Sequence, residues 1–214
     1  TKRGPRQITL GGEGANQSLL DQLYHVFPST RLSHIYASTE MGVCFSVHDG
    51  REGFPLQWLS SPPQGCEMRI SEEGELLLRS QRRMKGYLDR SSATGEWHHS
   101  GDMVSVQGDR VTFCGRKSDT LNVGGFKVQP LAVEEVIRTI AGVVDVAVHG
   151  VRSSISGELA AARVQIDKRC SADAMQSRIM AACHATLPRH MVPAKLSFTY
   201  ESIRHGDKLC RAHT

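Results

Sequence analysis

The segment Leu32-Ser33-His34-Ile35-Tyr36-Ala37-Ser38-Thr39-Glu40 changes from an apolar strand pattern to a polar end. Residues 7–10 before it are typical of a short buried strand, and a helical apolar pattern follows the glycine loop 11–14 and ends before Pro28. The apolar positions of this helix are Leu19, Leu20, Leu23, Val26 and Phe27. This order predicts a strand–helix–strand unit. Ligands bind at the carboxyl edge of such sheets, where residues 36–40 would lie.

From residue 41 to residue 115 the pattern changes to short strands separated by glycine-containing turns. We expect strands at 75–78, 103–106 and 110–113, and the last two flank Gln107-Gly108-Asp109 as the strands of a hairpin do. The spacing indicates a small β-barrel or sandwich.

After Lys117 the pattern indicates a compact α+β domain. One helix begins at Pro130 and could be closed by Gly142, and another begins near Ser171 as its N-cap and stops before Pro188. Val133, Val136, Ile137 and Ile140 form the apolar stripe of the first helix, and Met175, Ile179, Met180 and Ala182 lie in the second. Strands are expected at 144–148, 160–166 and 195–200. The predicted fold class is α+β and multidomain.

Composition narrows the possible functions. The chain is 39% hydrophobic and 22% charged, which is ordinary for a globular protein. The net charge of +4 comes without a dense basic run interleaved with aromatic residues, so no nucleic-acid partner is expected. No apolar run approaches the roughly 20 residues of a membrane span, and the basic N-terminus lacks a secretory signal, which makes the cytoplasm the default location. The six cysteines lack the paired spacing of a disulfide framework or a zinc site.

Four polar islands are spaced along the chain. They are Tyr36-Ala37-Ser38-Thr39-Glu40, Glu96-Trp97-His98-His99-Ser100-Gly101-Asp102, Gly115-Arg116-Lys117-Ser118-Asp119 and Asp207-Lys208, and the segment Asn122-Val123-Gly124-Gly125-Phe126-Lys127-Val128 follows the third of them. Together they resemble the adenylate-forming (AMP-binding) superfamily, which contains acyl- and aryl-CoA ligases, peptide-synthetase adenylation domains and luciferases. Residues 75–80 and 84–87 look closer to the acyl-CoA ligases than to amino-acid-activating domains.

The resemblance implies that the chain is the C-terminal portion of such an enzyme. Residues 1–115 would end the large adenylation domain with a strand–helix–strand and a small β-barrel, residues 116–119 would be a hinge, and residues 120–214 would be a small mobile domain. Nothing in the sequence is like the Ser/Thr/Gly-rich, lysine-ended phosphate loop that precedes these motifs in the family. The isolated chain is therefore expected to be inactive and to need an upstream N-terminal portion as its partner.

The resemblance also assigns roles to residues. Tyr36 would stack on adenine, Thr39 would contact the α-phosphate, and Glu40 would help to hold Mg²⁺. Asp102 would accept the ribose hydroxyls, with Arg116 as a second contact. The whole implied nucleotide-binding set is Gly12, Glu13, Tyr36, Ala37, Ser38, Thr39, Asp102 and Arg116. The simpler alternatives are a helix cap formed by residues 38–40 and a turn aspartate at position 102.

The second half of the chain would serve domain rotation and thiol transfer. Ser118 occupies the hinge position, Gly124 and Gly125 would line a thiol channel, and Lys208 would be catalytic together with Thr39 and Glu40. The chain departs from the family pattern at several positions: Ala37 replaces glycine, Glu96 replaces glycine, Ser100 replaces threonine, Ser118 replaces aspartate or lysine, and Asp207 precedes Lys208 where glycine is usual. The alternatives are a plain β-turn at Gly124-Gly125 and a solvated lysine in a frayed tail.

The implied function is ATP-dependent carboxylate activation. Such an enzyme forms an acyl-AMP from ATP and a carboxylic acid, with Mg²⁺, and passes the acyl group to the thiol of CoA or of phosphopantetheine on an acyl-carrier protein. Two other classes remain open from the sequence: a truncated, non-catalytic homologue that acts as an interaction module, and one half of a split or proteolysed enzyme.

Overall fold

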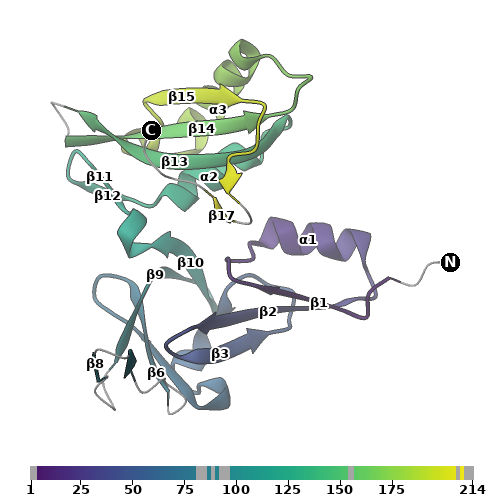
Figure 1. Cartoon of the computed structure of the whole chain (residues 1–214), viewed down its shortest axis with the longest axis vertical. Coiled ribbons are helices and arrows are strands. Elements are labelled where there is room, and N and C mark those ends of the chain that lie inside the picture. The colour runs from purple at the N-terminus through teal and green to yellow at the C-terminus, as the bar shows by residue number, and fades with distance from the viewer. Residues whose placement is uncertain are drawn as a thin grey trace. The chain divides into compact units, whose positions relative to one another are not determined.

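The computed structural model describes residues 4–80, 86–87, 90–91, 97–153, 157–205 and 208–209, with the backbone alone at 64, 86–87, 90–91, 205 and 208–209. The chain forms two compact units, Thr1–Phe113 and Cys114–Thr214, which are described separately (Figure 1). Both units mix helices with β-sheets.

The first unit begins with the expected strand–helix–strand. Strand β1 (Gln7–Gly11) and strand β2 (Arg31–Ser38) are parallel, helix α1 (Gln17–Val26) connects them, and β3 (Gly42–Val47) adds an antiparallel strand beside β2. The Asn16 side chain caps α1 by accepting a hydrogen bond from the Leu19 amide. Leu20 of the helix and Leu32 of β2 are both almost fully buried, so this pair forms the centre of the contact between helix and sheet.

A five-stranded sheet completes the first unit, in the order β4-β10-β9-β6-β5. Its strands are β4 (Phe54–Pro55), β5 (Cys66–Ile70), β6 (Glu75–Ser80), β9 (His98–Gln107) and β10 (Arg110–Arg116). The hairpin predicted around residues 107–109 is confirmed as β9–β10. Over the described residues the pairings join these five strands into one sheet in that order, and the small β-barrel or sandwich expected for residues 41–115 stays a prediction. The short strands β7 (Gly86–Tyr87) and β8 (Arg90–Ser91) pair with each other as a separate two-stranded sheet.

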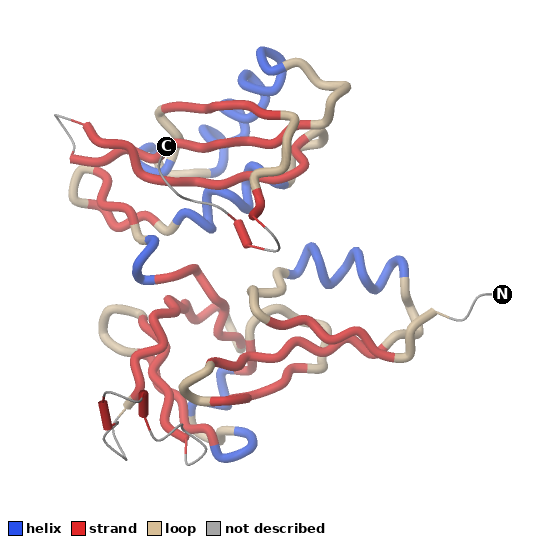
Figure 2. The backbone as a smooth tube through the Cα atoms, in the orientation of Figure 1, coloured by secondary structure: helices blue, strands red, loops and turns tan. Residues whose placement is uncertain are grey.

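The second unit is a sheet with two helices packed on it (Figure 2). The sheet contains β11 (Leu121–Val123), β12 (Phe126–Val128), β13 (Val143–Ser153), β14 (Gly157–Ile166) and β15 (Lys195–Thr199), with β15 parallel to β14. Helices α2 (Pro130–Arg138) and α3 (Ala172–Thr186) share one hydrophobic core with it. The predicted helices and strands of this half are confirmed.

Two helix boundaries show how local chemistry acts. Ser171 caps α3 as expected, because its side chain accepts a hydrogen bond from the Ala174 amide. Helix α2 begins at Pro130 as expected but ends at Arg138, earlier than the apolar stripe suggested. Gly142, with φ of 99°, instead directs the chain into β13.

The remaining elements are short. Single turns of 3₁₀-helix occur at Leu56–Leu59, Pro63–Gly65, Lys117–Asp119 and Arg189–Met191, and the two-residue strands β16 (Arg204–His205) and β17 (Lys208–Leu209) form a hairpin. Over the part of the chain that the structure describes, no helix has the length and apolar character needed to cross a membrane.

Candidate nucleotide site and motif positions

Two of the predicted segments meet at the carboxyl edge of the parallel pair β1–β2. Gly11 pairs with Ile35 at the end of the parallel register, so Gly12, which follows β1, comes next to Tyr36, which continues β2 and pairs with Phe45 of β3. Gly12 has φ of 86° and is exposed, as is Glu13 after it. The topology therefore brings two separate parts of the expected nucleotide-binding set to one edge.

The Ser38-Thr39-Glu40 sequence forms a turn between β2 and β3, which corrects the helix-cap alternative. The Ser38 hydroxyl oxygen accepts a hydrogen bond from the Met41 amide at 3.1 Å, and the chain then enters β3 at Gly42. Thr39 is exposed and Glu40 is half-buried. A tight turn of this kind presents short polar side chains at the end of the sheet.

Tyr36 and Asp102, which are 66 positions apart in the sequence, are in direct contact. The Tyr36 hydroxyl donates a hydrogen bond of 2.5 Å to Oδ2 of Asp102. Burial and the neighbouring carboxylate raise the pKa of Tyr36 far above its ordinary value, so the phenol stays protonated and remains the donor. The Tyr36 ring is stacked with Phe45 and Phe113, each with a centroid distance of 5.1 Å.

A buried glutamate holds the backbone that carries Asp102. Oε1 of Glu75 accepts a hydrogen bond from the Gly101 amide at 3.1 Å, and Oε2 lies 3.0 Å from Nδ1 of His99. The register between β6 and β9 shifts at this point, and Gly101 adopts φ of 75°. The shift is a β-bulge, a feature that re-aims a side chain. Sequence reasoning used Glu75 only as a strand residue and missed this role.

Ser100 adds a second support to the same bulge. Its hydroxyl donates to the Leu76 carbonyl at 2.6 Å and accepts from the Asp102 amide at 3.0 Å. The hydroxyl at this position is thus used structurally, between β6 and β9. The threonine that is usual in the family motif would supply the same hydroxyl.

The second unit contains the remaining predicted positions. Arg116 is exposed at the end of β10, and the Ser118 hydroxyl donates to Oδ1 of Asp119 at 3.0 Å within a 3₁₀ turn. Gly124 and Gly125 form the two-residue turn between β11 and β12, with φ of 57° and 88°. Two successive positive φ angles are the signature of a type I′ hairpin turn, in which other L-residues are strained.

Lys208 lies in the β16–β17 hairpin, where its backbone is paired with that of His205. The Lys208 side chain, Glu96, residues 84–85 and the departure at Asp207 lie outside what the structure describes. The roles of these residues, like those of the other motif residues, stay predictions.

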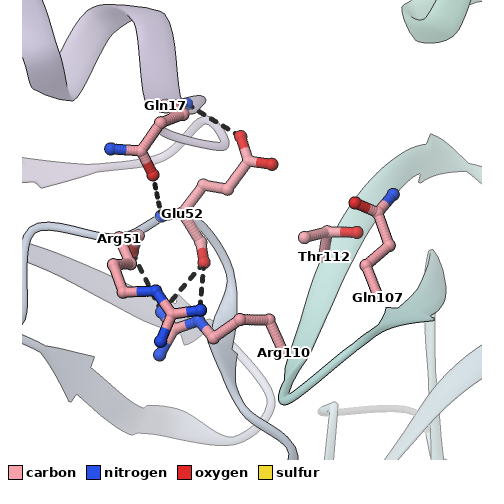
Figure 3. Close-up of a pocket in the computed structure, with 6 residues that line it drawn as sticks. All are labelled: Gln17, Arg51, Glu52, Gln107, Arg110 and Thr112. Carbon is pink, nitrogen blue, oxygen red and sulfur yellow. Dashed lines mark hydrogen bonds between the residues drawn. The ribbon is translucent and has the colours of Figure 1, made fainter.

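A separate pocket of about 200 Å³ occurs in the first unit (Figure 3). It is lined by Gln17, Arg51, Glu52, Gln107, Arg110 and Thr112, none of which was a predicted site residue. Arg110 binds the backbone carbonyls of Arg51, Glu52 and Gly53 and also Asp49, and the Glu52 carboxylate accepts from the Gln17 amide at 2.7 Å. These contacts brace loop 49–53 and the start of α1.

Comparison with known proteins agrees with this arrangement. Residues 132–205 match the AMP-binding enzyme C-terminal domain family. Long-chain-fatty-acid–CoA ligase of Salmonella typhimurium is 28% identical over 210 residues, which cover 91% of this chain and 37% of that protein. 4-Coumarate–CoA ligase 1 of Arabidopsis thaliana is 26% identical over 181 residues, or 74% of this chain and 32% of that protein.

The fold also matches solved structures. The ATP-bound structure of MatB from Rhodopseudomonas palustris aligns with a TM-score of 0.81 and 21% identity, over 96% of this chain and 44% of that one. The chain thus spans less than half the length of each of these proteins. These matches confirm the resemblance to the adenylate-forming superfamily: the chain corresponds to the C-terminal portion of its acyl- and aryl-CoA ligases and carries their AMP-binding C-terminal domain.

Proposed function

We propose that this chain is the C-terminal portion of an ATP-dependent acid–thiol ligase. In the first step a carboxylate oxygen attacks the α-phosphorus of ATP, and the bond to pyrophosphate breaks. In the second step a thiol sulfur attacks the acyl carbon, and AMP leaves. The observation that carries the proposal is the contact of Tyr36 with Asp102 beside the carboxyl edge of β1–β2, where the family motifs require the nucleotide.

The ribose would be held by Asp102. A carboxylate has acceptor sites for about four hydrogen bonds, so the bond from Tyr36 uses only part of its capacity. Gly12, Glu13, Ala37 and Ser38 would border the nucleotide. Because Phe45 and Phe113 already stack with the Tyr36 ring, adenine would contact the part of the ring that these residues leave uncovered.

Charge on the phosphates would be met by several groups. Thr39 would donate its exposed hydroxyl to the α-phosphate, Arg116 would contact ribose or phosphate, and Lys208 would stabilise the charge that develops as pyrophosphate leaves. Glu40 lies in a turn and offers the carboxylate oxygens that Mg²⁺ prefers, so it fits an ion shared with the phosphates. The bound ion would neutralise phosphate charge.

The second unit would serve the thiol step. Ser118, in the turn that follows β10, would be the pivot between residues 1–115 and 120–214. The Gly124–Gly125 turn has open space where side chains would otherwise project, which suits the approach of a pantetheine arm. The acceptor would be CoA or an acyl-carrier protein. The other partners would be a carboxylic acid and the upstream portion of the protein. The proposed location is the cytoplasm, which would supply ATP and CoA.

The test is acid-dependent exchange of labelled pyrophosphate into ATP. The full-length protein should catalyse it when a suitable carboxylic acid is present, and a panel of fatty and aromatic acids should identify the class. The 214-residue chain alone should not, because it has no phosphate loop. Absence of exchange with every acid would contradict the proposed activity. Robust exchange by the chain alone would contradict the need for an upstream portion.

A further inference from the structure

Four charged side chains form a network inside the second unit. Glu134 of α2 is completely buried; its Oε1 accepts from the Val148 amide at 2.9 Å, and its Oε2 lies 3.3 Å from Nη2 of Arg138. Asp145 of β13 is only 7% exposed and contacts two guanidinium groups. Nε of Arg138 lies 3.5 Å from its Oδ1, and Nε of Arg204 donates to its Oδ2 at 2.6 Å.

The inward position of Asp145 has a local cause. The register of β13 with β14 shifts between Val143 and Asp145, and such a bulge changes the face to which a side chain points. Val144 is 57% exposed, whereas Asp145 beside it is buried. A carboxylate placed there needs partners, because burying an unpaired charge is very costly.

Arg204 brings a second guanidinium group to Asp145. Glu134 and Asp145 carry two negative charges, and Arg138 supplies one positive charge to both of them. Arg204 supplies the second, although it comes from the tail of the chain, 59 positions after Asp145. The Arg204 side chain is 36% exposed, but Asp145 is buried, so loss of Arg204 would leave a buried carboxylate with Arg138 alone, and the network favours a docked tail.

Arg204 is also the first residue of the hairpin that carries Lys208. Residue 204 pairs with Leu209, and His205 pairs with Lys208. Ile203, the residue before, is 4% exposed and provides an apolar anchor. The backbone of the Lys208 hairpin is therefore tied at its base by one buried side chain and one charged pair.

We infer that Arg204, held by Asp145, is a positioning residue that fixes the Lys208 hairpin for the adenylate-forming step. This inference rests on the proposed function for the role of Lys208, whereas the docking itself does not. Arg204 does not act on the substrate; it sets where the hairpin leaves the small domain. Loss of this fixed point would misplace Lys208 and would leave the Gly124–Gly125 turn unchanged.

The test uses the full-length protein with Arg204→Met, which keeps the length of the side chain and removes its charge. The second variant is Asp145→Asn/Arg204→Met, which removes the charge of both partners. It serves if the single variant folds poorly, because it does not leave the Asp145 carboxylate without Arg204. Arg204→Lys keeps the charge without the guanidinium fork. Arg169→Met is the matched control, since Arg169 pairs with Asp167 at 2.8 Å in the same unit but is 89% exposed.

Two readouts are measured. Hydrogen exchange at the amides of residues 204–209 should become about tenfold faster in both Arg204→Met variants, because local opening follows the loss of docking contacts. Acid-dependent pyrophosphate exchange should fall about tenfold or more, since small misplacements of a catalytic group are costly, while thioester formation from supplied acyl-AMP stays within about twofold. Arg204→Lys should recover part of both losses, and Arg169→Met should resemble the wild type.

Unchanged amide protection in the Arg204→Met variants would overturn the inference. An equal fall in both half-reactions would overturn it as well, because that pattern indicates general destabilisation. If the wild-type protein shows no pyrophosphate exchange with any acid, the proposed function fails, and the hydrogen-exchange comparison still decides whether Arg204 docks the hairpin.

Discussion

Glu75 in the first unit and Glu134 in the second are both buried carboxylates, but they stabilise their surroundings in different ways. Glu75 accepts a hydrogen bond from the Gly101 amide and contacts His99, a side chain that is 69% exposed. Glu134 accepts from the Val148 amide and shares Arg138 with Asp145 inside the core. Glu75 thus fixes a backbone bulge at the edge of a site, whereas Glu134 belongs to a charge-balanced network between a helix and a sheet.

The comparison separates two kinds of residue in this protein. The motif residues Asp102 and Lys208 carry the proposed chemistry. The backbone at Asp102 is held by the buried Glu75, and the hairpin of Lys208 is held through Arg204 by the buried Asp145. A carboxylate that binds amides and an exposed histidine can lose one partner to water. Glu134 is completely buried, so its removal should affect folding first.

The largest expected effect is therefore on stability, from Glu134→Ala. The change removes one of two buried negative charges and leaves Arg138 and Arg204 with Asp145 alone, so the free energy of unfolding should fall by about 3 to 5 kcal/mol. Urea unfolding of the full-length protein, followed by a signal from the second unit, measures it. A loss of unfolding free energy as small as that expected for an exposed ion pair such as Arg169–Asp167 would show that Glu134 does not stabilise the fold through this network.

The next effect separates the two half-reactions. Lys208→Ala should slow acyl-AMP formation by about 10² or more, because in the proposed function the lysine stabilises charge only while pyrophosphate departs. Gly125→Leu should instead impair thiol transfer and spare pyrophosphate exchange, since a side chain would fill space beside the turn and strain its positive φ. Each half-reaction is assayed separately. If Lys208→Ala leaves pyrophosphate exchange intact, the lysine is only a solvated charge of the tail.

A smaller effect concerns the Tyr36–Asp102 bond. Tyr36→Phe keeps the stacked ring and removes the hydroxyl, so stability at neutral pH should fall by about 1.5 kcal/mol, the lower value for a hydrogen bond to a charged group. The folded-state pKa of Tyr36 is raised by burial and by Asp102, so its contribution is complete below the ordinary tyrosine pKa of about 10 and is lost as the pH rises above it.

The pH dependence of stability tests whether the Tyr36 hydroxyl donates to Asp102. The difference in unfolding free energy between the wild type and Tyr36→Phe should be constant from pH 7 to pH 9. It should shrink above about pH 10. A difference that grows with pH, or no difference at neutral pH, would mean that the phenol does not donate to Asp102.

The comparison also shows what the sequence could predict. Periodicity and capping residues located the strand–helix–strand, the β9–β10 hairpin and both helices of the second unit, because these are local features. The strand order β4-β10-β9-β6-β5 within residues 54–116 could not be predicted, since strand order depends on pairings far apart in the sequence. A strand as short as β4 contains too few residues to show an alternating pattern.

The supporting residues could not be predicted for the same reason. The partners of Glu75 lie 24 and 26 positions away, and Arg204 lies 59 positions from Asp145. Glu75 occupies an ordinary position in a strand pattern, and a bulge between Val143 and Asp145 breaks the alternation that would place Asp145 outside. The motif residues were recognisable only because the family resemblance identifies them.

The most direct test of the account is a double-mutant cycle between Asp102 and Glu75, with ATP affinity of the full-length protein measured by calorimetry. Asp102→Ala should weaken binding by about 1.5 to 3 kcal/mol and reduce discrimination against 2′-deoxy-ATP. Glu75→Gln alone should weaken it by about 1 kcal/mol, because the bulge that aims Asp102 loses a charged acceptor. If Glu75 acts through Asp102, its effect should vanish in the Asp102→Ala background. Full additivity of the two changes, or unchanged ATP affinity in Asp102→Ala, would contradict the account.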